Sequence, residues 1–591
     1  MLLGQMTETF TDQQTADASL VVLGGNPTPP PGYNALFAWQ PPSDRPEQFR
    51  SPFPKTNRIT LDPASQCATR LEVVSGPGAR VLTFNDRRTK CCAYLWGRAA
   101  HRRWNSDQLL PRLVDAVIGR RPADLSDLIG TFVALVDDRL NGQVAVVTDA
   151  LGLQPFFVGS RAGAFAGGSD VWAIGRAGLC GSRLNYDAVS SWLLHGYECG
   201  DDTLMQDLHR PAPAAITYYR GASTTPVRYH RPIGGEARPQ RTEIADAIHD
   251  NVSQAFDLLT ADIPDLNIAL SGGFDSRLVA AMSKRKLGDR ARATVVKEID
   301  SDAFVAERVA QTLKMPLEVI NTDGSRWNIY DEPFGFSPAG FPITKQVSWV
   351  VANKRPGVPL ISGFLGDSLV RGSADRRDGK LDRETTEDLT VVQSRHRQAA
   401  NNRLDLLDPA FARRCEDRAI SVLRRMTDAG TELGKPNLYL SLYLGHRCYL
   451  ANNFTQHFDI SEAVMPFHLW NLVDLRFRNE YDCFTWETYD LLFRRHYPAL
   501  ADIPHNQRSD IPNQAKAVPS RRVRQWAGGL LGQLANPQCL PIVNRRKTIP
   551  RLAGAWLGRR DVQDVSIFLR RLYLLEQRAR QGGIEFDWNK V

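Results

Sequence analysis

The chain has 591 residues, of which 42% are hydrophobic and 23% charged, and its formal net charge is +8. This length and composition are typical of a globular protein with two or more domains. No apolar stretch approaches the ~18 residues of a membrane span, and the first residues have neither the basic head nor the apolar core of a signal peptide. We therefore expect no membrane span and a cytoplasmic location.

Nine cysteines are scattered along the chain, and only Cys91 and Cys92 lie next to each other. The sequence has no Cys-x2-Cys pair and no Cys/His cluster with the spacing of metal ligands. We expect reduced thiols and no zinc site.

The first part of the chain has the pattern of an antiparallel sheet. Residues 1–35 are polar and then rich in Gly and Pro, which is typical of a loose arm. The predicted elements are strands at 128–138, 143–149 and near 155–158, with an Asn-Gly turn at 141–142, and a capped helix at 184–194. Residues 234–239 have the composition of a linker.

After this linker, strand and helix patterns alternate, as expected for a parallel α/β sheet. The predicted strands are 266–270, 293–297, 317–320 and 358–362, and the predicted helices are 242–259, 276–286, 303–313 and 345–353. Residues 370–591 have mostly helical patterns. We therefore expect two domains, at residues 1–235 and 240–591.

Residues 271–276, with the sequence SGGFDS, follow the apolar strand at 266–270 and open the next helix. This layout directs backbone N–H groups and a helix N-terminus at one point, which favours an anion. Gly272 and Gly273 leave room for a phosphate to approach. Asp275 would repel a bare phosphate, so its carboxylate is best explained as a ligand of a Mg²⁺ ion that also contacts the phosphates. The segment predicts a nucleotide site.

A second Gly-rich turn, Gly363 to Ser368, follows the predicted strand 358–362. Ligands of parallel sheets lie beyond the carboxyl ends of the strands, so this turn should face the same edge as residues 271–276. Asp367 is then placed as a second Mg²⁺ ligand. A plain turn that caps a helix would have the same local pattern.

Residues 508–551 carry nine basic side chains and one acidic side chain, Asp510. Such a tract could contact phosphates, an acidic peptide or simply solvent. No nucleic-acid motif accompanies it, and we expect no nucleic-acid partner.

Over about residues 90–510, the chain resembles the asparagine synthetase B superfamily. The matching segments are residues 270–276 (LSGGFDS), 302–310 (DAFVAERVA), 362–367 (SGFLGD), 465–467 (MPF), 130–137 (GTFVALVD), 148–156 (TDALGLQPF), Leu184-Asn185 and 195–197 (HGY). The resemblance implies an α+β fold followed by an α/β fold. The first is a degenerate glutamine amidotransferase-like domain of the Ntn type with an antiparallel sheet. The second is a parallel-sheet ATP pyrophosphatase domain, similar to the adenine nucleotide alpha hydrolases, with a helical C-terminal part.

The resemblance also implies ATP and Mg²⁺ as cofactors and assigns residues to them. The implied ATP-binding residues are Leu270, Ser271, Gly272, Gly273, Asp275, Ser276, Val296, Ser362 and Gly363. Leu270, Val296, Ser362 and Gly363 would contact the adenosine part. Asp275 and Asp367 would hold the metal.

Two departures from the amidotransferase pattern argue against glutaminase activity. Those enzymes attack glutamine with an N-terminal cysteine, whereas Met1 is followed here by Leu2 and the first cysteine is Cys67. Their glutamine-binding Asn-Gly-Glu segment is replaced by Trp96-Gly97-Arg98. Since no ammonia is then released, the amine must come from the substrate.

Among members that lost the glutaminase, the chain looks most like the lasso peptide cyclases. These enzymes adenylate an Asp or Glu side chain of a ribosomally made peptide, and the N-terminal amine of that peptide then closes a macrolactam. The implied partners are a precursor or core peptide, together with a leader-binding protein and a leader peptidase. A small-molecule ligase of the β-lactam synthetase type and a non-catalytic nucleotide-binding scaffold are the alternatives.

The residues of the ring-closing step are less clear from the sequence. The position that is Glu in asparagine synthetases and Tyr in β-lactam synthetases is Phe364, which can act only as an apolar wall. The essential lysine of the family has no direct counterpart after residues 503–508 (IPHNQR). Arg508 and Lys516 are the candidates, with a solvated surface lysine as the plain alternative. His505 could be a base or a structural residue.

Overall fold

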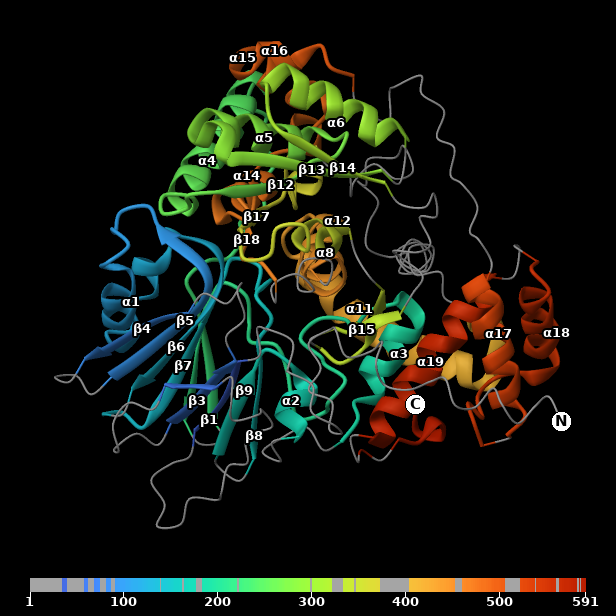
Figure 1. The fold of residues 1–591 in the computed structure, drawn as a ribbon. Coiled ribbons are helices and arrows are strands. Elements are labelled where there is room, and N and C mark those ends of the chain that lie inside the picture. Colours follow the sequence, from blue (N-terminus) through green and yellow to red (C-terminus); the bar gives the residue numbers. More distant parts are fainter. Residues whose placement is uncertain are drawn as a thin grey trace.

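The computed structural model describes residues 35–39, 58–61, 69–74, 81–86, 91–138, 140–161, 164–176, 183–220, 223–297, 300–321, 333–337, 339–344, 347–371, 403–451, 460–504, 521–536, 538–559, 563–581, 584 and 586–591. Two antiparallel sheets form the N-terminal part, a parallel sheet follows, and helices make up most of the rest (Figure 1).

The larger antiparallel sheet has the strand order β11-β10-β7-β6-β5-β4. Its strands are β4 (Val81–Asp86), β5 (Cys91–His101), β6 (Leu128–Asp138), β7 (Gln143–Thr148), β10 (Ala215–Arg220) and β11 (Ser223–Arg228). The hairpin of β6 and β7 is the one that the Asn-Gly turn predicts. Every residue of β6 is buried, as expected for a central strand.

The second antiparallel sheet has the order β2-β3-β1-β9-β8. Its strands are β1 (Ala35–Trp39), β2 (Arg58–Leu61), β3 (Thr69–Val74), β8 (Phe157–Arg161) and β9 (Ala164–Gly168). The sequence predicts a strand near 155–158 in one antiparallel sheet with β6 and β7, and the assignment to that sheet was wrong. That strand is β8, which pairs with β9 in the second sheet.

The parallel sheet has the order β14-β13-β12-β17-β18, and all of its pairs are parallel. Its strands are β12 (Leu266–Ala269), β13 (Ala291–Lys297), β14 (Leu317–Asn321), β17 (Leu360–Ile361) and β18 (Ala463–Val464). The strand order reverses between β12 and β17. Ligands of open parallel sheets bind at such a switch point, beyond the carboxyl ends of the strands.

Helices surround these sheets and form the C-terminal region. They are α1 (Leu109–Ile118), α2 (Val171–Arg176), α3 (Tyr186–His195), α4 (Arg241–Leu259), α5 (Phe274–Leu287), α6 (Asp300–Leu313), α8 (Val347–Ala352), α9 (Gly366–Leu369), α11 (Pro409–Thr431), α12 (Pro436–Leu440), α14 (Trp470–Arg478), α15 (Trp486–His496), α16 (Pro498–Ala501), α17 (Arg521–Leu534), α18 (Arg545–Trp556) and α19 (Gln563–Gln581). Single turns of 3₁₀ helix are η2 (Pro122–Leu125), η3 (Gly288–Arg290), η5 (Leu404–Leu406), η7 (Tyr481–Cys483) and η10 (Trp588–Lys590), and a short hairpin joins β15 (Pro333–Phe336) and β16 (Pro342–Thr344). Residues 441–450 form a π-helix, η6 (Ser441–Leu450).

Local sequence accounts for several helix boundaries. The side chain of Asn185 accepts hydrogen bonds from the backbone N–H groups of Asp187 and Ala188 and so caps α3. Gln240 and Glu243 form a capping box at the start of α4, directly after the linker. These caps lie where the sequence predicts helix starts.

One continuous apolar core joins the antiparallel and parallel parts. It includes Val146 of β7, Ile248 of α4, Ile268 of β12 and Val473 of α14. A second cluster packs α3 and α11 against α17, α18 and α19. Within the described residues no helix is long and apolar enough to cross a membrane, and no disulfide joins the seven cysteines that they contain.

Candidate nucleotide and metal site

The first predicted loop closes tightly on itself between β12 and α5. Leu270 continues the sheet, since its N–H donates to the carbonyl of Thr294 at 3.0 Å. The backbone N–H of Ser271 donates to Oγ of Ser276 at 3.0 Å, and the N–H of Gly273 donates to Oγ of Ser271 at 3.2 Å. These bonds hold the turn of residues 271–276 in place.

The N-terminus of α5 is available to an anion. Gly273 is the N-cap residue, and it has no side chain that could bond to the N–H groups of the first turn. The helix is 14 residues long, so its positive end is directed at the loop. This is the arrangement that residues 271–276 predict for a phosphate site.

The second predicted loop follows β17, the strand that pairs with β12. The N–H of Ser362 donates to Val464 of β18 at 3.2 Å, and the N–H of Phe364 donates to Oγ of Ser362 at 3.2 Å. Leu365 has φ +73°, a left-handed conformation that costs energy for a residue other than glycine. Strained residues of this kind occur most often at functional sites.

The two loops touch through glycines. A Cβ atom on Gly366 would lie 2.4 Å from Oδ1 of Asp275, and one on Gly363 would lie 2.6 Å from Cβ of Asp275. Only residues without a side chain allow this approach. The structure therefore brings together Asp275 and the second loop, as the sequence predicts.

The carboxylates of Asp275 and Asp367 interact directly. Burial, and next the negative charge of Asp367, raise the pKa of Asp275 to about 7. Repulsion between two carboxylates favours binding of a cation beside them. Two carboxylates beside an uncapped helix N-terminus fit Mg²⁺, which takes few protein oxygens and keeps phosphate and water ligands. The described residues contain no cluster of three or more His, Cys, Asp or Glu that could hold a metal, so the fit is to a two-carboxylate site.

The residues implied to contact adenosine lie at the same edge of the sheet. Leu270 and Val296 are both buried, at the ends of β12 and β13. Val296 packs with Val351, Ala352 and Leu360 in a small apolar cluster beside the loops. Ser362 and Gly363 are partly buried next to them.

Three side chains at the site were missed by sequence reasoning. The hydroxyl of Tyr489 donates to Oδ1 of Asp275. Nε2 of His446 lies 3.1 Å from Oγ of Ser368 and 3.8 Å from Oδ1 of Asp367. The guanidinium of Arg371 stacks on Trp486 at 4.3 Å and lowers the pKa of Asp275 by its charge. Of these three residues, only Arg371 could be linked to the site from the sequence, because it lies four residues after Asp367.

The ring-closing candidates Arg508 and Lys516, together with His505 and Asp510, lie outside the described residues. The described chain ends just before them at Pro504, where Arg277 of α5 holds it. The buried guanidinium of Arg277 donates to the carbonyls of Leu500, Ile503 and Pro504 at 3.3, 2.8 and 3.1 Å. The ring of Phe364 lies 5.5 Å from that of His446 in a tilted arrangement and packs against the core.

The segment at residues 96–98 joins the two parts of the molecule. Arg98 is buried, and its guanidinium donates to Oε2 of Glu462 at 2.7 Å, to the carbonyl of Leu259 at 2.7 Å and to Asp262 at 2.6 Å. Glu462 directly precedes β18. The ion pair of Arg98 and Glu462 therefore connects the antiparallel sheet with the parallel sheet.

A second buried pair lies at the same junction. Asp149 follows β7, accepts from the N–H groups of Leu153 and Gln154 at 2.9 Å, and lies 3.2 Å from Nε2 of His468. Nδ1 of His468 is 2.9 Å from Oγ1 of Thr131. The amidotransferase-like motif at residues 148–156 is thus bonded to the chain that follows β18.

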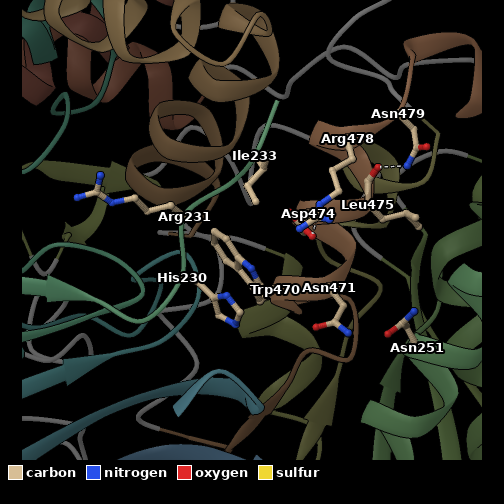
Figure 2. Close-up of a pocket in the computed structure, with 10 residues that line it drawn as sticks. All are labelled: His230, Arg231, Ile233, Asn251, Trp470, Asn471, Asp474, Leu475, Arg478 and Asn479. Carbon is tan, nitrogen blue, oxygen red and sulfur yellow. Dashed lines mark hydrogen bonds and ion pairs between the residues drawn. The ribbon is translucent and has the colours of Figure 1, made fainter. Parts of the chain in front are cut away.

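A polar pocket of about 360 Å³ lies between α4, α14 and the linker, as Figure 2 shows. The rings of His230 and Trp470 stack there with 4.4 Å between their centroids. Asp474 bonds to Arg478 at 2.7 Å on the same helix. None of the predicted nucleotide residues lines this pocket.

The described part of the basic tract forms α17 and α18, which pack against α19 far from the parallel sheet (Figure 1). Arg551 pairs with Asp405, and Arg545 donates to the carbonyl of Cys539 at 2.9 Å. These helices do not line the nucleotide edge.

Comparison with protein families gives one match. Residues 102–230 match the glutamine amidotransferase domain. The match includes β6, β7 and Asp149, so this part of the chain is similar to an amidotransferase, and it supports an enzyme. No curated protein matches the chain.

Two solved structures are similar to about half of this chain. One is the allosteric regulatory enzyme of purine biosynthesis, with 10% identity over 49% of this chain and 75% of that one, at a TM-score of 0.21. The other is glutamine phosphoribosylpyrophosphate amidotransferase from B. subtilis complexed with ADP and GMP. It has 15% identity over 52% of this chain and 63% of that one, at a TM-score of 0.19. Neither TM-score is high enough to support a conclusion about this chain.

Proposed function

We propose that the protein is an AMP-forming, ATP-dependent amide ligase, and specifically the macrolactam cyclase of a lasso peptide. The observation that carries the ligase proposal is the meeting of the two loops at the switch point of the parallel sheet. There Asp275, Asp367 and the uncapped end of α5 converge. This is a set of groups that suits a metal-bound nucleoside triphosphate.

The proposed reaction has two steps. A carboxylate oxygen of the substrate attacks the α-phosphorus of ATP, the bond to the β-phosphate oxygen breaks, and pyrophosphate leaves with the electron pair. The amine nitrogen of the substrate then attacks the acyl carbon of the adenylate. The bond to AMP breaks, the amine gives up a proton, and an amide and AMP result.

The chain contributes binding and orientation to the first step. Asp275 and Asp367 would hold Mg²⁺, which when bound neutralises charge on the phosphates. The N–H groups at the start of α5 would contact phosphate oxygens. Leu270 and Val296 would contact the adenine.

The amine is proposed to come from the substrate. Arg98 pairs with Glu462 where an amidotransferase would hold glutamine, so a glutamine cannot use that position without breaking a buried ion pair. This supports a ring-forming reaction, in which one molecule brings both carboxylate and amine.

The choice of a lasso peptide follows from the resemblance of the GFLGD turn at residues 363–367 and of the divergent N-terminal part. A small-molecule ligase of the β-lactam synthetase type is the second candidate, and a non-catalytic scaffold is the third. Retention of both carboxylates argues against the scaffold.

The test incubates the protein with Mg²⁺, ATP and synthetic peptides that carry a free N-terminal amine and one Asp or Glu at varied positions. We expect release of pyrophosphate and AMP and, by mass spectrometry, a product that has lost one water. The same peptide with an acetylated N-terminus should give no cyclised product.

The outcome that would contradict the proposal is equal turnover by Asp275→Ala and wild type on a substrate that the wild type converts. Pyrophosphate release with small amino acids and none with peptides would favour the β-lactam synthetase type of ligase.

A further inference from the structure

Each of the two candidate metal carboxylates is contacted from the C-terminal helical region. Tyr489 of α15 reaches Asp275, and His446 of the π-helix η6 reaches the turn that carries Asp367. We propose that Tyr489 and His446 are positioning residues that orient the two carboxylates toward one divalent cation. This inference rests on the proposed function, because it takes the two carboxylates to be the metal ligands.

Apolar neighbours hold the ring of Tyr489 in place, independently of its hydrogen bond to Asp275. Its side chain is fully buried, and its ring lies 5.3 Å from that of Phe274 and 6.3 Å from that of Phe493. The hydroxyl donates to one oxygen of Asp275, so a rigid donor sets the plane of a carboxylate that stands on the first turn of α5. Such hydrogen bonds to a ligand carboxylate commonly orient it for a metal.

His446 is fixed in a similar way, and its partners define its tautomer. Nδ1 lies 2.7 Å from the carbonyl of Ser441, which can only accept, so Nδ1 carries the proton. In the neutral ring Nε2 is then the acceptor, and Oγ of Ser368, 3.1 Å away, donates to it. That bond holds the residue directly after Asp367. The ring also packs against Phe364, at the start of the same turn.

The π-helix gives His446 this position. A π-helical turn is rare, holds an extra residue per turn compared with an α-helix, and often marks a functional site. Along η6, His446 is buried and directed at α9, and the bond between its Nδ1 and Ser441 lies within the π-helix itself. The π-helical backbone of η6 therefore places His446 in contact with the second loop.

The contacts made by Tyr489 and His446 act against the electrostatic repulsion between the two carboxylates. The second loop, which carries Asp367, is in contact with Asp275 through Gly363 and Gly366, and two carboxylates on touching loops repel each other. Without fixed partners, each carboxylate would turn away from the other. Instead, the donor Tyr489 of α15 fixes Asp275, and His446 of η6 fixes the turn beside Asp367 through Ser368, which lowers the cost of organising the site when a cation arrives.

The test measures binding of Mn²⁺ together with α,β-methylene-ATP to the full chain, by electron paramagnetic resonance of free Mn²⁺. We expect Tyr489→Phe and His446→Leu each to weaken Mn²⁺ binding by about 10-fold to 100-fold. His446→Gln, which can present an acceptor near the position of Nε2, should recover much of the loss. The spectrum of bound Mn²⁺ should change in both weakened variants.

Matched controls separate positioning from general damage. Tyr497→Phe removes a hydroxyl that lies near His249, and Tyr443→Phe removes one from η6 itself, where the ring packs on Tyr439. Both should bind Mn²⁺ as the wild type does. If Tyr489→Phe and His446→Leu match these controls while Asp275→Asn and Asp367→Asn lose binding, the positioning inference is wrong and the metal site stands. If the wild type itself binds no Mn²⁺ with the nucleotide, or the two Asn variants bind it unchanged, the proposed function fails.

Discussion

Gly366 sets how closely the two loops of the candidate site approach each other. A methyl group there would lie 2.4 Å from Oδ1 of Asp275, well inside normal contact. We expect Gly366→Ala to displace one loop and to weaken Mn²⁺-nucleotide binding by about 10-fold or more. Isothermal titration calorimetry with α,β-methylene-ATP would measure this.

The control for that change is Gly532→Ala in α17, where no atom lies within 4 Å of the added methyl group. It should leave binding unchanged and raise stability by about 0.5–1 kcal/mol, because alanine loses less backbone entropy on folding. Equal binding by both alanine variants would show that the loops do not need their close approach.

Arg371 is the cation nearest to the two carboxylates among the residues that shift the pKa of Asp275. Nε of its guanidinium is buried without a hydrogen-bond partner in the described structure. We expect Arg371→Met to weaken binding of α,β-methylene-ATP by about 10-fold and to leave AMP binding almost unchanged, because in the proposed site this charge would act on the β- and γ-phosphates. Competition against a fluorescent nucleotide would compare the two.

Arg308→Met is the corresponding control, since Arg308 stacks on Phe304 at 5.2 Å on the surface of α6. A loss of AMP affinity as large as the loss for the triphosphate would contradict a phosphate role for Arg371.

At the residue scale, the sequence predicts the parts of the site that are local motifs. Residues 271–276 and Asp367 stand in short Gly-rich turns after strands, and such turns carry their own signal. Tyr489 and His446 have none, because Tyr489 lies 214 residues from Asp275 and His446 lies 78 residues from Ser368. Such contacts arise only from the packing of helices.

At the scale of elements, Arg277 joins α5 to the turn after α16. Three carbonyls accept from one buried guanidinium, which also lies 4.8 Å from the ring of Phe274. We expect Arg277→Met to leave these carbonyls unsatisfied at a cost of about 1–3 kcal/mol each if they stay buried. Opening of the turn would avoid that cost.

Hydrogen exchange would follow this change. Amides of α16 and of the first turn of α5 should exchange faster, while those of β6 should keep their protection. Lys284→Met removes a cation from the exposed side of the same helix and should leave both regions unchanged. Uniformly faster exchange in Arg277→Met would show a global defect instead of a local connection.

The elements themselves differ in how well sequence predicts them. β6, β7, α3 and α4 have long periodic patterns and clear turns or caps, and the prediction of these elements is confirmed. β1, β2 and β3 were missed, because each has four to six residues between Pro- and Gly-containing segments. β8 was assigned to the wrong sheet, because pairing partners of a five-residue strand depend on the rest of the fold.

At the scale of the whole molecule, Arg98 and Glu462 hold the antiparallel and parallel parts together. Both side chains are at most 10% exposed. We expect Arg98→Met to destabilise the protein by about 3–5 kcal/mol, because Glu462 is left buried without its cation. Denaturant unfolding would measure this, and the double variant Arg98→Met with Glu462→Met should recover part of the loss.

Arg103→Met is the control, since Arg103 pairs with Asp127 at a site where its own side chain is 65% exposed. A surface pair of this kind contributes about 0–1 kcal/mol. If Arg98→Met cost no more than Arg103→Met, the ion pair would not be a structural connection between the two parts.

The pair of Asp149 and His468 makes the free energy of unfolding sensitive to acid. Burial alone would raise the pKa of Asp149, but His468 and the backbone N–H groups outweigh it and hold the pKa below its usual value. The stabilising contribution is therefore present above the unfolded pKa of about 3.9 and is lost as the pH falls below it.

We expect the free energy of unfolding to fall more steeply below about pH 4 in the wild type than in Asp149→Asn. Denaturant titrations at a series of pH values would compare the slopes. The same slope in both proteins would show that this carboxylate does not take part in acid unfolding.

The ion pair at Arg98 also constrains how this protein could evolve. A carboxylate at position 98 would lie beside Glu462 and Asp262. Three acidic groups would then be close together, with Glu462 largely buried, and the molecule would lose stability. Substitution at position 98 is therefore limited by the charge of Glu462, and an acidic residue there would require a compensating change in the part of the chain that carries β18.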